Sequence, residues 1–104
     1  MMDERQAQAL VTAIKLKSRA WIDDDMYGAF LHTEIFGSLP QDVSVIPSKE
    51  GDGFAVSARW KYIGEVFNSV DEWEAFAAKI EERMGLAALA DKGEAESPYY
   101  NEMW

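Results

Sequence analysis

Apolar residues recur at a helical period over the first part of the chain. The positions that carry this pattern are Ala7, Leu10, Val11, Ile14 and Trp21. Asp3 followed three residues later by Gln6 is typical of a helix start, because each side chain can satisfy a free backbone amide. The pattern predicts a helix over about residues 4–21, ended by the acidic run Asp23-Asp24-Asp25.

The next segment fits two structures. Asp25 can cap a second, shorter helix that contains Met26, Phe30 and Leu31 and stops before Gly37. The stretch 30–36 also alternates weakly, as a strand would. We favour the helix.

The middle of the chain has the two-residue period of β-strands. Phe54, Val56, Ala58 and Trp60 alternate with Ala55, Ser57 and Arg59. Short β-rich runs at 43–46 and 63–67 lie on either side, and the glycine-containing stretch 49–53 is typical of a turn. Short links make neighbouring strands pair antiparallel, so a three-stranded meander is predicted.

A well-marked helix follows. Ser69 and Glu72 form a capping pattern, and Gly85 stands where a left-handed helix terminator is expected. Between them the apolar stripe consists of Trp73, Phe76, Ala77, Ile80 and Met84. The prediction is a helix over about 70–84 that packs across the sheet, then a linker over 91–97, with a further helical turn at 86–89 left open.

These elements predict an α+β fold: an N-terminal helix, a short second helix, a three-stranded antiparallel sheet and a C-terminal helix. With 104 residues the chain suits one domain, which we place at 1–97. The segment 98–104 contains Tyr99, Tyr100 and Trp104, and we expect these aromatic side chains to dock on this domain or on a partner.

Charge changes the picture more than length does. The formal net charge is −9, and cysteine is absent. Without cysteine there is no disulfide scaffold, thiolate metal site or cysteine nucleophile. A negative field repels nucleic acid and anionic membranes and attracts basic surfaces. We see neither a secretory signal nor an apolar run long enough for a membrane span, so we expect a cytoplasmic protein with no membrane partner.

Candidate chemistry is sparse. His32 is the single histidine, and His32 with Glu34 lacks the further ligands of the zinc motifs that begin this way. Asp23, Asp24 and Asp25 are consecutive rather than alternating, which suits a solvated helix end better than a calcium loop. We therefore expect neither an enzyme nor a cofactor. A metal-dependent activity that uses His32, Glu34 and the aspartates is the weaker alternative.

One helix face suggests a use for the acidity. At about 100° per residue, one outer face of helix 70–84 collects Asp71, Glu74, Glu81 and Glu82. Neighbours on such a face lie about 5–6 Å apart, comparable to phosphates along a strand. With Asp23, Asp24 and Asp25, these carboxylates are the predicted partner-binding residues. Ordinary solvation of a surface helix is the plainer interpretation.

In size, acidity and lack of catalytic motifs the chain resembles small phage inhibitors of host defence, the anti-CRISPR and anti-restriction class, and also immunity proteins and antitoxins. The resemblance is one of character and assigns no residue a role. It implies a non-enzymatic DNA mimic that occludes the cationic site of a basic, nucleic-acid-handling protein, anchored by Tyr99, Tyr100 and Trp104. The alternative is an assembly module or accessory subunit that uses its aromatic C-terminus.

Overall fold

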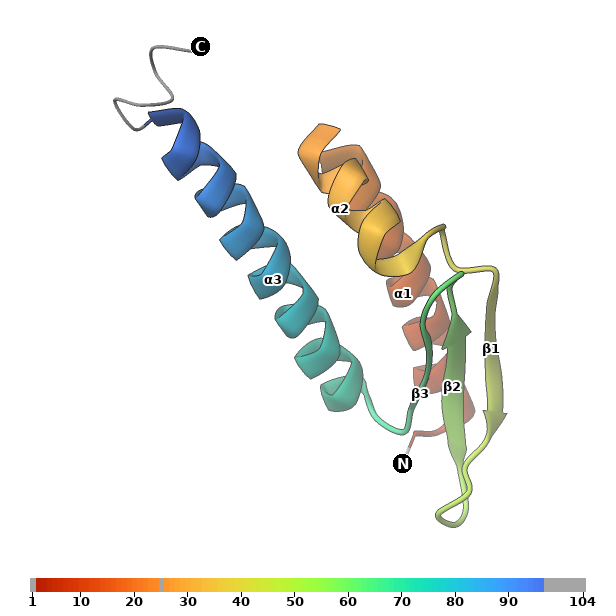
Figure 1. The fold of residues 1–104 in the computed structure, drawn as a ribbon. Coiled ribbons are helices and arrows are strands. Elements are labelled where there is room, and N and C mark those ends of the chain that lie inside the picture. Colours follow the sequence, from red (N-terminus) through yellow and green to blue (C-terminus); the bar gives the residue numbers. More distant parts are fainter. Residues whose placement is uncertain (1, 25, 97–104) are drawn as a thin grey trace.

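The computed structural model describes residues 2–24 and 26–96, with side chains over 2–23 and 29–85. Its elements are, in chain order, α1 (Glu4–Asp24), α2 (Met26–Phe36), β1 (Asp42–Pro47), β2 (Phe54–Arg59), β3 (Gly64–Phe67) and α3 (Val70–Glu96). The sheet is an antiparallel meander in the order β1-β2-β3 (Figure 1). The α+β class, the second helix and the meander are all confirmed.

Both predicted helix starts are present. At α1, Asp3 Oδ1 accepts from the Gln6 amide at 2.8 Å and Gln6 Oε1 accepts from the Asp3 amide at 3.0 Å, which is a complete reciprocal cap. At α3, Ser69 Oγ accepts from the Glu72 amide at 3.1 Å, while the Glu72 carboxylate accepts from the Asn68 amide. Each helix therefore begins where its side chains satisfy amides that lack helical partners.

The predicted end of α3 is wrong, whereas α1 ends inside the predicted acidic run, slightly beyond the expected residue 21. α1 continues through Asp23 to Asp24, and α3 continues through Gly85 to Glu96. Gly85 keeps a negative φ, and a Cβ built on it would meet no atom within 4 Å. A helical glycine costs only about 1 kcal/mol relative to alanine, so the good helix formers that follow can carry the helix past it. The predicted linker at 91–97 is accordingly helical through Glu96.

The left-handed terminator lies instead at the end of α2. Gly37 has a φ of +81°, and its amide donates to the Thr33 carbonyl at 2.9 Å. A Cβ there would lie 2.7 Å from the Tyr62 ring and from Lys61, so only glycine fits. The Tyr62 amide donates to the Phe36 carbonyl at 3.0 Å, which fastens the β2–β3 turn to the end of α2.

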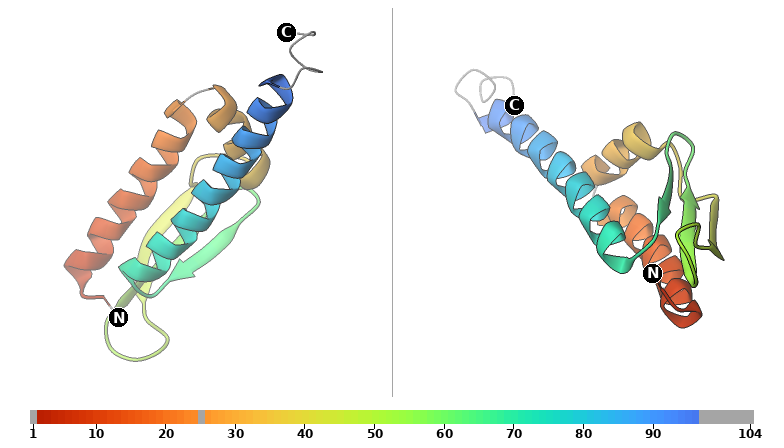
Figure 2. Two further views of the ribbon diagram at one scale, coloured as in Figure 1. Left: turned by 90° about the vertical axis from the view of Figure 1, so that its left-hand side faces the viewer. Right: turned by 90° about the horizontal axis from the view of Figure 1, so that it is seen from below.

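The helices all lie on one face of the sheet (Figure 1; Figure 2, right). On that face Val56 of β2 pairs with Val45 of β1 and with Phe67 of β3, and Ala58 is buried beside it. Met2 joins the same body, because its backbone bridges to Phe54 and its side chain is buried. Sheet and helices thus enclose a single apolar core.

An aromatic cluster fills that core. Its members come from all three helices, from β3 and from the residue that follows β2: Trp21, Phe36, Trp60, Phe67, Trp73 and Phe76. Helix α3 reaches the sheet through Phe67, whose ring centroid is 5.3 Å from those of Trp73 and Phe76. Trp60 Nε1 donates to the buried Ser18 Oγ at 3.3 Å, so this polar edge is satisfied within the core.

Candidate protein-binding surface

The acidic side chains lie on the outside of the molecule. Every carboxylate whose side chain the structure describes is exposed. Among these described side chains there is one ion pair, in which Lys17 Nζ lies 3.3 Å from Glu81 Oε2. The surplus negative charge is therefore left for solvent and for other molecules.

Helix α3 presents the row that the sequence predicts, with one exception. The side chains of Asp71, Glu74 and Glu82 are exposed and form no hydrogen bond or ion pair with another described residue. Exposed Ala75 and Ala78 lie on the same outer face, so the row is low in profile. From Asp71 to Glu82 it spans roughly 16 Å along the helix axis.

Glu81 is the exception. Its Oε2 accepts from Lys17 Nζ and from Trp21 Nε1, both at 3.3 Å. Both donors belong to α1, so Glu81 fastens α3 to α1 and is not free for a partner in the way that Glu82 is. Asp71 also has a structural role, because a carboxylate in the first turn of a helix is stabilised by the helix dipole.

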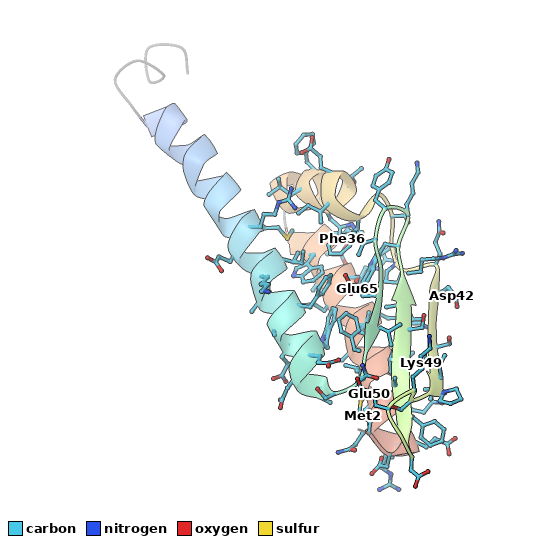
Figure 3. The ribbon with its side chains drawn as sticks, turned by 60° about the horizontal axis from the view of Figure 1, so that its bottom comes forward. Met2, Phe36, Asp42, Lys49, Glu50 and Glu65 are labelled. Carbon is cyan, nitrogen blue, oxygen red and sulfur yellow. The ribbon has the colours of Figure 1, made fainter. Side chains whose placement is uncertain are left out.

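The remaining predicted residues do not join this row. Asp23 is exposed near the end of α1, where Asp24 is the last helical residue. Asp25, Tyr99, Tyr100 and Trp104 lie outside the described residues, so the predicted aromatic anchor stays a prediction. Other carboxylates are spread over the sheet, with Asp42 on β1, Glu50 in the β1–β2 turn and Glu65 on β3 (Figure 3). The coherent acidic feature is therefore the face of α3.

An apolar groove that the sequence did not predict lies beside this face. It has a volume of about 460 Å³ and runs between α1 and α3, which rise side by side in the same direction (Figure 2, left). Its lining residues are Gln6, Ala9, Leu10, Ala13 and Lys17 from α1, and Val70, Trp73, Glu74, Ala77 and Glu81 from α3. The floor is apolar, and the charged residues Lys17, Glu74 and Glu81 stand at its edges.

A signal for the groove was present in the sequence. Besides its core stripe, α1 carries a second apolar strip at helical spacing, formed by Ala9, Ala13, Leu16 and Ala20. All four are exposed, and Leu16 is 65% exposed. A second strip on a helix whose first strip already fills the core indicates a face that no described side chain of this chain covers.

His32 belongs to the core. It is 1% exposed, and its ring lies 4.8 Å from Phe36 and 6.3 Å from Trp21. Among the described residues its Nε2 has no hydrogen-bond partner, and burial lowers the pKa of the imidazole below its ordinary value of 6.5. Glu34 is exposed on α2. Over the described residues, no three histidine or acidic side chains gather closely enough to hold a metal ion.

Comparisons with known proteins add no relative. No family model matches the chain, and neither the curated proteins nor the solved structures give a significant match. Within the described part of the chain, no helix has both the length and the hydrophobicity needed to cross a membrane.

Proposed function

We propose that this protein is a non-enzymatic inhibitor that binds a basic, nucleic-acid-handling protein through the acidic face of α3, with Asp71, Glu74 and Glu82 in place of phosphates. The single observation that carries the proposal is that the surface has many exposed carboxylates and few cations paired with them. All described carboxylates are exposed, yet only Glu81 is paired with a cation of the same chain. The site of action would be the cytoplasm, where the chain would bind no nucleic acid directly.

The geometry of the row supports this role. Asp71 and Glu74 are one helical turn apart, and such neighbours lie about 5–6 Å from each other. Glu82 follows about 12 Å further along the axis, and the residues on the face between them are the small, exposed Ala75 and Ala78 and, at the edge toward α1, Glu81. A flat cationic surface can thus approach several carboxylates without meeting a bulky side chain.

Charge of this kind mainly raises the association rate and the specificity, so the complex should be sensitive to salt. The wild-type protein, immobilised in a bacterial lysate, should capture a nucleic-acid-binding protein at low salt, and duplex DNA should displace that protein. The triple variant D71K/E74K/E82K should lose capture by roughly tenfold or more, because each reversal places like charges opposite each other.

The matched control is D42K/E50K/D52K, which changes the charge by the same amount on the sheet side of the molecule. It should keep capture within about threefold, because only the long-range field is altered. Equal losses in the two triple variants would refute recognition by α3, and capture that DNA does not displace would refute the nucleic-acid mimic.

A further inference from the structure

The groove between α1 and α3 is open, and exposed apolar side chains stand beside it. Leu16 of α1 is 65% exposed and Val70 of α3 is 38% exposed. Ala9 and Ala13 are exposed along the wall between them, while Ala77 forms part of the floor. Small side chains on both helices leave room for a large apolar side chain from another molecule.

The two sides of the groove carry opposite charge. Beyond the apolar strip of α1, at about 100° per residue, come Arg5 and Arg19, both exposed, with the exposed Asp23 on the same flank near the end of the helix. Beyond the groove on α3 come the exposed carboxylates Asp71, Glu74 and Glu82. The basic residues Lys79 and Arg83 fall on the other flank of α3, away from the groove. The groove therefore has a cationic bank on α1 and an anionic bank on α3.

The Lys17–Glu81 ion pair fixes the relative height of the two banks. Arg19 is two residues beyond Lys17 and Glu82 is one residue beyond Glu81, so their heights differ by roughly 1.5 Å. Arg5 is 12 residues before Lys17 and Asp71 is 10 residues before Glu81, so the heights of Arg5 and Asp71 differ by roughly 3 Å. Each arginine thus lies at nearly the height of a carboxylate on the opposite bank.

We propose that this groove binds a second copy of the chain, in a dimer whose two-fold axis runs along the groove. Such an axis preserves height and exchanges the banks, so α1 of each copy covers α3 of the other. Arg19 then faces Glu82 of the partner subunit, and Arg5 faces Asp71 of the partner subunit. Leu16 enters the partner's groove about 4.5 Å along the axis from the level of its Ala77.

Charge selects this arrangement over the antiparallel one. A two-fold axis across the helices would place α3 on α3, with the two acidic banks against each other, which is unfavourable. It would also bring the arginines of the two α1 helices together. Only the axis along the groove makes the surface complementary to itself.

This inference goes beyond the proposed function, and a substitution can separate the two. The dimer covers Asp71 and Glu82, so a second copy and a basic partner compete for the same bank. Leu16, by contrast, serves only the dimer. The variant Leu16→Glu should therefore dimerise poorly and still capture the basic protein.

Sedimentation equilibrium of the full chain at about 0.15 M salt, where repulsion between two acidic copies is screened, measures the association. The wild type should form dimers with a Kd below about 0.1 mM. Leu16→Glu should weaken this at least roughly tenfold, because it places a charge in the apolar groove. Val66→Glu is the matched control: Val66 is 48% exposed on β3, and its variant should dimerise like the wild type.

A charge exchange tests the geometry itself. Arg19→Glu alone and Glu82→Arg alone should each weaken self-association roughly tenfold, because each creates two like-charged pairs per dimer. An equimolar mixture of the two variants should restore it, since both pairs are then complementary. The proposal would be overturned if the wild type stays monomeric or if the mixture does not associate. It would also be overturned if deleting residues 98–104 abolishes the dimer while Leu16→Glu does not.

Discussion

The two sides of α3 differ in what they contact. The inner side contributes Trp73, Phe76 and Ile80 to the core. The ring centroid of Phe76 lies within 6.3 Å of the centroids of four other aromatic rings. The outer side carries Asp71, Glu74 and Glu82, which contact no charged group among the described residues. Stability should therefore depend on the inner side and recognition on the outer side. Substitutions at neighbouring positions can test this division.

The largest effect is expected from Trp73→Ala compared with Glu74→Ala. Trp73 is 4% exposed and contacts rings from α1 and β3, so removing the indole should lower the free energy of unfolding by about 3–5 kcal/mol. Glu74 is exposed, and its truncation should change stability by less than about 0.5 kcal/mol. Urea denaturation followed by circular dichroism measures both, and a similar loss in the two variants would contradict the division.

The next effect is a pH dependence set by His32. Burial depresses its pKa in the folded state, so protons bind more readily to the unfolded chain. The contribution of the neutral imidazole is complete above pH 6.5 and is lost as the pH falls from there toward the folded-state pKa. The slope is at most about 1.4 kcal/mol per pH unit.

Urea denaturation of the wild type and of His32→Leu between about pH 7.5 and 5.5 isolates this term, because carboxylates titrate mainly below that range. The wild type should lose stability over this range, and the variant should lose much less. An equal slope in both proteins would show that another group is responsible.

The smallest effect separates two adjacent glutamates. Glu81→Gln removes a half-exposed ion pair with Lys17, and such pairs contribute about 0.2–1 kcal/mol. Glu82→Gln removes no contact with a described residue, so its stability should match the wild type or slightly exceed it, since net repulsion falls. Thermal unfolding of the two variants side by side gives the comparison. A greater loss in Glu82→Gln would mean that the ion pair does not fasten α3 to α1.

Much of the fold follows from local signals. The caps at Asp3 and Ser69 are made by side chains three residues from their targets, so sequence alone was enough to place them. The alternation through β2 likewise predicted its buried face. The prediction from Gly85 was wrong because a glycine can either end a helix or lie inside it. Which of the two occurs depends on the backbone that follows the glycine.

The candidate surface was only partly predictable. The wheel of α3 placed Glu81 with Asp71, Glu74 and Glu82, but the partners of Glu81 come from α1, some 60 residues earlier in the chain. No periodicity within one helix reveals a contact of that range. For the groove, the second apolar strip of α1 was a signal in the sequence, but the strip alone does not show that α3 forms the other wall.

The position of Phe76 has a consequence for synthesis. Its ring meets Phe36, Trp60, Phe67 and Trp73, so the aromatic core cannot close before the first turns of α3 have left the ribosome. Until then the nascent chain must keep large rings of earlier segments in contact with water, where they are prone to aggregate. Translation that stops before α3 should therefore yield a sticky fragment rather than a smaller folded protein.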